Sequence, residues 1–379
     1  MTMTTKQEIL KEKLEEYLQA NKAGKGLILD QIEAVSRMNR KAIIRRMRRL
    51  QLTPAAAERR GRPEFYDMRV TIALKEVWQI ANEICAERLH PMMSEYVTVL
   101  TRDRMWNHDL LSTQKLIQMS LGTMKDRIAS FAKTSTRGGK GSTKPSGLRE
   151  IIPIRRGPWE NPDPGYGEVD TVAHCGASLA GDYGYSVQYT DVALIWTCLS
   201  AQWNKGEKAT RNSIERVQSR LPFPLKGIDP DSGGEFINWL LKGWCDQQGI
   251  TMTRTRPYYK NDHARIEQKN YTNIRDFLGY TRIGSQRKIK LMNELYDHLE
   301  DYINFFLPSV KCVKKERTGS KYKRIYDKAQ TAYLRVLAHP GIAEEIKAGL
   351  KVKYARLNPK ILKDKVDLLT SKILNNTHY

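Results

Sequence analysis

Residues 166–203 contain three consecutive runs, YGEVDTVAHCG (166–176), YGYSVQYTDVAL (183–194) and IWTCLSAQW (195–203). Each run is rich in β-branched and aromatic residues, and turn signals separate them, which is typical of three neighbouring antiparallel strands. The pattern then changes to a helix (207–220), a strand (224–229), a helix (236–248), a strand (250–256) and a long helix from about residue 262. This alternation predicts a mixed α/β core over residues 166–285.

The N-terminal segment 1–60 has helical periodicity. Its stretch GLILDQIEAVSRMNRKAIIRRMRRL (26–50) divides into two short amphipathic helices around a turn at residues 36–39, which predicts a helix-turn-helix. The second helix carries a basic face made of Lys41, Arg45, Arg48 and Arg49. We expect this face to contact DNA, because so many unmatched cations on one helix are costly unless an anion neutralises them. A solvated helix face is the alternative.

A short basic segment, RRGRP (59–63), follows this module. Its residues Arg60 and Arg62 could contact a minor groove, and a plain linker is an equally good interpretation. The next helical region, 64–132, ends in two helices around a tight turn at 120–123. It is either a second helix-turn-helix module or a purely structural bundle.

The remaining boundaries follow from composition. Residues 133–165 include TSTRGGKGSTKPSG (134–147), which is too poor in apolar residues to pack and predicts a flexible basic linker. Residues 286–379 contain an amphipathic helix around 290–306, a basic stretch at 311–323 and helical segments at 342–352 and 359–374. We therefore expect a multidomain protein of α and α/β modules, with a basic, helical C-terminal region.

The overall composition restricts the partner. The formal net charge of +22 favours a polyanion, either a nucleic acid or an anionic membrane. No apolar run is long enough to span a bilayer, the N-terminus is too polar for a secretory signal, and no segment has the apolar face of a membrane-surface helix. The five cysteines form no CxxC pair, so their spacing predicts neither a zinc finger nor a disulfide framework. We expect a cytoplasmic protein with a nucleic-acid partner.

Three acidic residues stand at informative positions. Asp170 lies in the first predicted strand, Asp231 directly after the fourth, and Glu267 on the long helix, with 35 residues between the last two. Asp229 is an alternative to Asp231, and it would leave 37 residues before Glu267. Carboxylates are the ligands that Mg²⁺ prefers in proteins, and two such ions can catalyse phosphodiester cleavage.

The flanking residues carry a family resemblance. GEVDTVAH (167–174), DSGGEF (231–236) and KNDHARIEQKN (260–270) resemble the D,D-35-E core of retroviral integrases and bacterial insertion-sequence transposases. Ser232 and His263 depart from the asparagines that are usual in these motifs. The resemblance covers roughly residues 150–330 well and implies a central ribonuclease H-like core with a mixed sheet.

The resemblance also implies a metal site. Asp170 would bridge two Mg²⁺ ions, with Mn²⁺ as a substitute, and Asp231 and Glu267 would each complete one side. We expect Glu235 to support the loop after Asp231. His174 shares the strand face of Asp170. It is either a residue that supports a metal ligand or contacts DNA, or a structural histidine. Candidate DNA contacts around the long helix are Lys260, His263 and Asn270.

The implied activity is that of a bacterial DNA transposase. It would cleave double-stranded DNA at transposon ends and join the 3′-hydroxyl to target DNA, as a homodimer or larger oligomer associated with the nucleoid. Two alternatives remain open, a catalytically inactive DNA-binding regulator and a structure-specific nuclease of the same fold.

Overall fold

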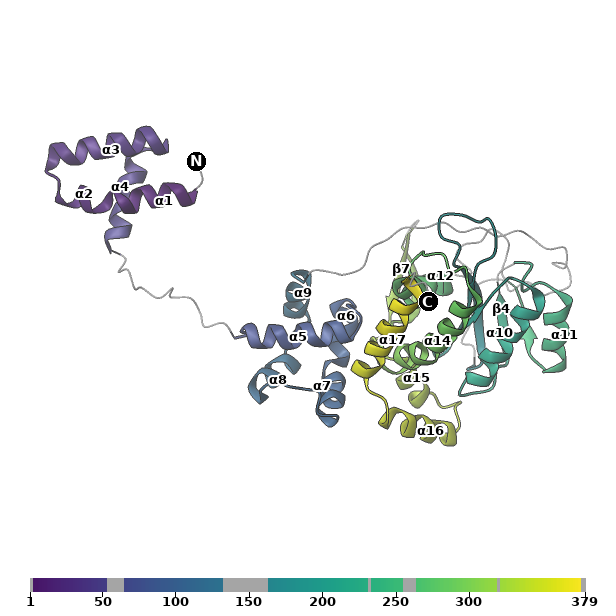
Figure 1. Cartoon of the computed structure of the whole chain (residues 1–379). Coiled ribbons are helices and arrows are strands. Elements are labelled where there is room, and N and C mark those ends of the chain that lie inside the picture. The colour runs from purple at the N-terminus through teal and green to yellow at the C-terminus, as the bar shows by residue number, and fades with distance from the viewer. Residues whose placement is uncertain are drawn as a thin grey trace. The chain divides into compact units, whose positions relative to one another are not determined.

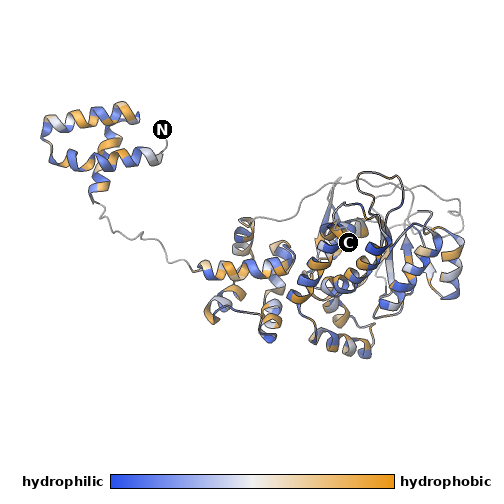
Figure 2. Ribbon diagram, in the orientation of Figure 1, coloured by the Kyte–Doolittle hydropathy of each residue, from blue (hydrophilic) through white to orange (hydrophobic). Residues whose placement is uncertain are grey.

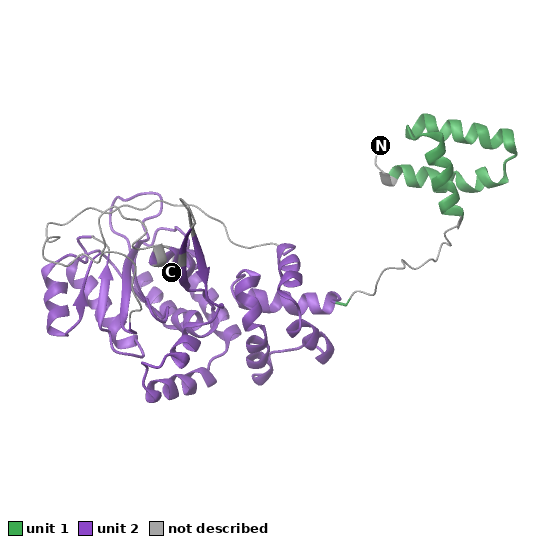
Figure 3. Cartoon of the chain, turned by 180° about the vertical axis from the view of Figure 1, so that it is seen from behind, with its two compact units in different colours: residues 1–65 green, residues 66–379 purple. Residues whose placement is uncertain are grey.

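A computed structural model describes residues 3–52, 65–131, 163–230, 233–254, 264–318 and 321–375. The chain divides into two compact units, Met1–Phe65 and Tyr66–Tyr379 (Figure 3). The predicted segments 64–132, 166–285 and 286–379 fall almost entirely within the second unit, where their helices share one apolar core.

The N-terminal unit consists of helices α1 (Met3–Glu12), α2 (Leu14–Gln19), α3 (Lys22–Ser36) and α4 (Arg40–Leu52). Apolar and polar residues alternate along these helices (Figure 2), as in amphipathic helices that pack on one side. Their buried side chains form a separate small core: Leu10, Ile28, Leu29, Ile32, Ile43 and Met47. Helix α3 ends at Ser36 and is capped by Arg37, whose φ of 53° is left-handed, and the chain turns there into α4.

The second unit is built on a mixed five-stranded sheet, labelled in part in Figure 1. Its strands lie in the order β3-β2-β1-β4-β5. Their bounds are β1 (Tyr166–Ala173), β2 (Tyr185–Asp191), β3 (Thr197–Gln202), β4 (Gly227–Pro230) and β5 (Thr251–Met252). Strands β1, β2 and β3 are antiparallel neighbours, and β4 runs parallel to both β1 and β5. The predictions of three antiparallel strands and of a mixed α/β core are confirmed.

Helices alternate with the later strands. They are α10 (Glu207–Arg220), α11 (Trp239–Gln247), α12 (Ala264–Asn270), the π-helical turn η4 (Tyr271–Arg275), α13 (Asp276–Leu278) and α14 (Gln286–Phe306). Of the strand predicted over 250–256, the described residues 250–254 form a strand only at Thr251–Met252 (β5), and residues 255 and 256 lie outside the described part of the chain. Within the described residues, the helix predicted from about residue 262 begins at Ala264 and changes to π-helical winding after Asn270.

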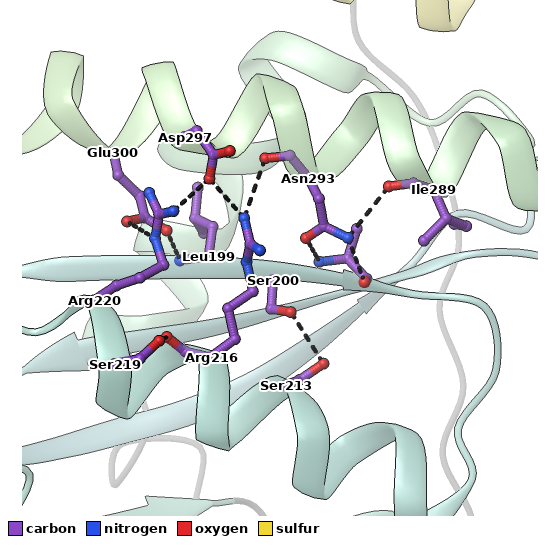
Figure 4. Close-up of polar contacts among 11 residues, drawn as sticks. Leu199, Ser200, Ser213, Arg216, Ser219, Arg220, Ile289, Asn293, Asp297 and Glu300 are labelled. Carbon is purple, nitrogen blue, oxygen red and sulfur yellow. Dashed lines mark hydrogen bonds and ion pairs between the residues drawn. The ribbon is translucent and has the colours of Figure 1, made fainter.

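Helix α14 covers the open edge of the sheet at β3 (Figure 4). The side chain of Asn293 exchanges two hydrogen bonds of 3.0 Å with the backbone of Ala201, and Glu300 Oε1 accepts from Leu199 N at 2.7 Å. Arg220 on α10 in turn donates to Glu300 Oε2 at 2.8 Å. The side chains of Asn293 and Glu300 thus form hydrogen bonds with backbone groups of β3 that an edge strand would otherwise expose.

Two helical segments, distant in sequence, pack together on this framework. The first contains α5 (Met68–Ile80), α6 (Ala86–Leu89), the 3-10 turn η1 (His90–Met92), α7 (Met93–Arg102), α8 (Leu110–Ile117) and α9 (Leu121–Ala129). The second contains α15 (Ala332–Ala338), α16 (Glu344–Ala355) and α17 (Pro359–Leu374). Tyr96 Oη donates to the carbonyl of Phe306 on α14 at 3.0 Å, and Asn358 Nδ2 donates to Asp103 Oδ2 at 2.6 Å.

The C-terminal region departs from its prediction. Residues expected to belong to a helical, basic region include a β-hairpin of strands β6 (Cys312–Thr318) and β7 (Lys321–Tyr326). The run CVKKERT has no apolar periodicity of either kind, so the sequence pattern gave no indication of strands here. The basic stretch 311–323, to which the sequence assigned no secondary structure, thus belongs mostly to this hairpin, and the description of the region as helical holds only outside it.

No helix in the described part of the chain combines the length and apolar character needed to cross a bilayer.

Candidate active site

Asp170 lies in β1, the central strand of the sheet, between β2 and β4. Its carboxylate is half-buried. Asn270 Nδ2, on α12, donates to Asp170 Oδ2 at 2.6 Å, and the backbone N–H of Thr171 donates to Oδ1 at 2.7 Å. The sequence placed Asp170 in this strand, and the structure adds a helix that holds its carboxylate.

Helix α12 is attached to β1 at two points. Besides the Asn270 contact, the backbone N–H of Ile266 donates to Glu168 Oε2 at 3.3 Å. Glu168 and Asp170 are two residues apart on one strand, so they share a face of the sheet. Glu267 lies between the two attachment points along the helix; its side chain is outside the described residues. Because three positions make nearly one helical turn, Glu267 and Asn270 occupy the same side of α12.

Strand β4 ends at the same level as Asp170. Val169 pairs in register with Pro230, and these two residues directly precede Asp170 and Asp231 in the sequence. Asp231 and Ser232 themselves lie outside the described residues. The backbone therefore brings the end of β4 beside the strand that carries Asp170.

Asp229, the alternative to Asp231, occupies a different environment. It lies within β4, is fully buried, and accepts a hydrogen bond of 2.6 Å from Thr253 Oγ1. A carboxylate enclosed in this way is less suited to meet a substrate than one at the end of the strand. The contact favours a structural role for Asp229.

Glu168 is a residue of this face that the sequence analysis missed. Its side chain is only 3% exposed, and it pairs in register with Asp229 across the parallel β1 and β4 strands. The period of two between Glu168 and Asp170 could have identified it, since buried acids on one strand face are uncommon. In the structure Glu168 fastens the start of α12.

Glu235 connects the loop after β4 to the opposite face of β1. Its Oε1 accepts from Thr171 Oγ1 at 3.0 Å and from Lys205 Nζ at 3.0 Å. The Glu235 side chain is nearly buried, and Asn238 Nδ2 donates to its backbone carbonyl at 2.8 Å. This arrangement agrees with the expected supporting role near the loop.

His174 is a structural histidine in this structure. It is fully buried, and its Nε2 lies 2.7 Å from Ser186 Oγ, which also contacts the Tyr296 hydroxyl on α14. Burial, and secondarily the charge of Arg275, lowers the pKa of His174 to about 3. The imidazole is therefore neutral at physiological pH.

The region beside α12 is rich in cations. Burial, together with the charges of Arg88 on α6 and Arg335 on α15, lowers the pKa of Lys269 to about 7. The two arginines bind successive backbone carbonyls, since Arg88 Nε donates to Pro308 O at 2.7 Å and Arg335 Nη2 donates to Ser309 O at 2.9 Å. The helix that carries Glu267 thus adjoins the chain segment leading into β6.

The predicted DNA contacts fall into three groups. Lys41, Arg45, Arg48 and Arg49 are exposed on α4. Asn270 contacts Asp170, as described above, so its predicted DNA contact stays a prediction. The positions that lie outside the described residues are Arg60, Arg62, Lys260 and His263.

The ligand chemistry of this site is that of oxygen donors. Among the described residues, no group of three His, Cys, Asp or Glu side chains is arranged to hold a metal ion. Asp231 and the side chain of Glu267 lie outside the described residues, so neither could count toward such a group. Asp170, which is half-buried, offers carboxylate oxygens, the type of donor that Mg²⁺ prefers in proteins.

Comparison with known proteins shows one relationship. No protein-family model matches the chain. The uncharacterized protein y4rM of Sinorhizobium fredii (strain NBRC 101917 / NGR234) is 33% identical over 330 residues, which cover 86% of this chain and 93% of y4rM. The chain belongs to the same family as y4rM. The matched length exceeds that of residues 166–285, so the relationship to y4rM includes more of the chain than the predicted catalytic core.

Proposed function

We propose that this protein is a DNA transposase of the DDE type, which cleaves DNA at transposon ends and transfers the 3′-hydroxyl to target DNA. The observation that carries the proposal is the 2.6 Å hydrogen bond from Asn270 to Asp170. It joins two of the three segments whose sequences resemble this family, although 99 residues separate them in the chain.

The third segment that resembles this family, residues 231–236, directly follows strand β4 of the sheet. In the proposal Asp231 follows β4 beside Asp170, because Pro230 is the register partner of Val169. Glu267 would point toward the same place from α12, since Asn270 on the same side of that helix contacts Asp170. Three acids would then converge from one central strand, the end of its neighbour and a helix.

The chemistry follows from this convergence. Bound Mg²⁺ ions would activate the attacking oxygen and neutralise charge on the phosphoryl group. Asp170, Asp231 and Glu267 would hold those ions, and the carboxamide of Asn270 would fix the orientation of the Asp170 carboxylate. Hydrogen bonds of this kind to a metal-binding carboxylate keep the carboxylate in one geometry and tune its affinity for the metal.

The sheet topology supports a ribonuclease H-like core as the finer description of the fold. The order β3-β2-β1-β4-β5, with three antiparallel strands followed by two parallel ones, has the first acid on the central strand. A functional site at the ends of neighbouring parallel strands is a common arrangement in α/β proteins.

The basic face of α4 supports DNA as the substrate. Lys41, Arg45 and Arg48 are exposed, and no described carboxylate forms an ion pair with them. In the proposal this helix contacts the transposon ends, and a homodimer or larger assembly brings two ends together. The reaction would take place in the bacterial cytoplasm, where the DNA is.

The test is cleavage of labelled duplexes taken from the two boundaries of the DNA element that contains the gene. With Mg²⁺, the wild-type protein is expected to nick these duplexes and to join their 3′ ends to a second DNA. Asp170→Asn, Asp231→Asn and Glu267→Gln should each bind DNA normally and abolish both products. Asp246→Asn, which removes an exposed acid on α11, is the matched control and should retain activity.

Each alternative has its own outcome. Binding without Mg²⁺-dependent nicking by the wild type would indicate a DNA-binding regulator. Nicking without joining would indicate a nuclease. Nicking retained by the three acid variants would remove the proposed site.

A further inference from the structure

The β6–β7 hairpin is joined to the second unit at its base. Ser309 and Gln330 exchange backbone hydrogen bonds of 3.0 and 3.2 Å, and Lys311 N donates to Asp327 Oδ1 at 2.6 Å. Lys311 Nζ also donates to the carbonyl of Ala193 at 3.0 Å. Among the described elements, β6 and β7 pack extensively only against each other. The base is thus fixed, and no other described element forms a layer against the two strands.

The hairpin is strongly cationic. Residues 312–326 contain six lysines and arginines and a single acid, Glu316. Lys314 Nζ lies 2.9 Å from Glu316 Oε1, and Glu316 is also the register partner of Lys323. The one carboxylate is therefore paired with a cation on its own side of the ribbon.

The register separates the cations into two faces. Lys315 pairs with Arg324, and Arg317 pairs with Tyr322. Directly opposed residues share a face, and faces alternate along a strand, so these four residues form one face, which we call the cationic face. The opposite face consists of Lys314, Glu316, Thr318, Lys321, Lys323 and Ile325. The cationic face contains no acid.

This arrangement is unfavourable for an isolated hairpin. A two-stranded ribbon is marginally stable in water without a packing partner, and like charges directly opposite each other destabilise it further. Lys315 and Arg324 are such a pair. A polyanion on the cationic face would reduce this repulsion and pack against the ribbon.

We propose that the cationic face of the β6–β7 hairpin binds the phosphate backbone of duplex DNA independently of base sequence. Lys315 and Arg317 are two residues apart on one strand, so their positions lie about 6.8 Å apart. This regular spacing suits a polymer that carries charges at regular intervals, as the DNA backbone does. A two-stranded ribbon also fits the width of a major groove. The cationic face has no large aliphatic side chains that would enter a lipid layer.

The hairpin adjoins the proposed catalytic helix through its base. Asp327, at the end of β7, forms an ion pair with Arg335, and the charge of Arg335 acts on Lys269 of α12. DNA held by the hairpin would thus lie next to the segment that carries Glu267. This inference rests on the proposed function only in taking DNA as the ligand.

The experiment compares two triple variants of the full-length protein. One removes the cationic face (Lys315→Gln, Arg317→Gln, Arg324→Gln), and the other removes the same number of charges from the opposite face (Lys314→Gln, Lys321→Gln, Lys323→Gln). Binding to a 30-base-pair duplex of arbitrary sequence is measured by fluorescence anisotropy at several salt concentrations. Circular dichroism melting checks that both variants fold.

The first variant should bind about tenfold or more weakly, and its plot of log affinity against log salt should be shallower by about two to three. The second should stay close to the wild type. The proposal would be overturned by equal losses of DNA affinity in the two variants or by no loss in either. It would also be overturned if the wild type did not bind DNA. Tighter binding of the wild type to phosphatidylserine vesicles than to the duplex at the same salt concentration would overturn it as well.

The same proteins separate this inference from the proposed function. If the wild type never nicks DNA with Mg²⁺ but the cationic-face variant alone loses affinity, the hairpin proposal stands and the transposase proposal fails. If the wild type nicks DNA and the two variants bind alike, the hairpin proposal alone fails.

Discussion

At the scale of single residues, the Asp170 carboxylate is the group on which the proposed chemistry depends. It sits on the central strand and receives a hydrogen bond from Asn270, which lies 100 positions away. A carboxylate bound in this way keeps one orientation as metal ions arrive and leave. Asn270 is therefore a positioning residue in the proposed site.

Replacing Asn270 by alanine is expected to lower Mg²⁺-dependent cleavage by about 10- to 100-fold, because the Asp170 carboxylate loses its fixed orientation. The concentration of Mg²⁺ at half-maximal rate should rise, and excess Mg²⁺ should restore part of the activity. The measurement is the nicking rate across a Mg²⁺ titration. Gln268→Ala, which changes an exposed position on the same helix, should behave as the wild type. An unchanged Mg²⁺ requirement in Asn270→Ala would contradict this role.

His174 gives a prediction about stability and pH. Its pKa is about 3 in the folded protein and near 6.5 when unfolded, so the unfolded chain binds more protons between these values. The free energy of unfolding should therefore fall as the pH drops below about 6.5, by roughly 1.4 kcal/mol per pH unit from this residue. Urea denaturation at pH 7.5 and 5.0 measures the effect.

In His174→Gln the loss of stability between these two pH values should be smaller than in the wild type. Glu300, whose pKa burial raises to about 7, contributes in the opposite direction, but it is present in both proteins and cancels in the comparison. Identical pH dependence in the two proteins would show that His174 is not buried as a neutral side chain.

At the scale of elements, polar side chains of α14 replace a missing strand at the edge of the sheet. Asn304 is almost fully buried; its Oδ1 accepts from Thr197 N and its Nδ2 donates to Thr197 O, both at 2.8 Å. Asn293 makes the equivalent pair of contacts with Ala201 (Figure 4). Helix α14 thereby protects an edge that could otherwise pair with another chain.

Replacing Asn304 by alanine should lower the free energy of unfolding by about 2–4 kcal/mol, because a buried backbone N–H and a carbonyl would both lose their partners. Chemical denaturation of the second unit's transition measures this loss. Asn212→Ala, at an exposed position on α10, is the control and should change stability little. A loss of similar size in both variants would mean that the Thr197 contacts contribute no special stability.

Sequence patterns predicted the elements that have a clear period. The three antiparallel strands and the amphipathic helix that became α14 were predicted because their apolar residues alternate or recur at helical spacing. The β6–β7 hairpin was missed because lysines and arginines occupy most of its positions and no apolar face marks the strands. The contacts of Asn293 and Asn304 with β3 could not be predicted, since they depend on where α14 lies against the sheet.

The candidate site, like the fold, could be predicted from the sequence only in part. Its three acids could be selected from motif and spacing, and Asp170 and β4 lie where the pattern indicated. The roles of Glu168 and Asn270 required the packing of α12 on β1, which brings together residues about 100 positions apart. Long-range pairing of this kind leaves no local signal in the sequence.

At the scale of the whole molecule, the chain combines two separate basic surfaces with one sheet-based unit. The exposed cations of α4 belong to the N-terminal unit, and the hairpin belongs to the second unit together with the proposed site. In this account the first surface selects a DNA sequence, and the second holds any duplex by its phosphates. The family relationship with y4rM covers most of this architecture.

The most direct measurement of the central claim is a crystal structure of the protein with Mn²⁺, in which anomalous scattering locates the ions. The account predicts Mn²⁺ bound jointly by the carboxylates of Asp170, Asp231 and Glu267, with the Asn270 carboxamide still in contact with Asp170. The account would be contradicted if the carboxylates of these three residues pointed apart and no ion were bound among them.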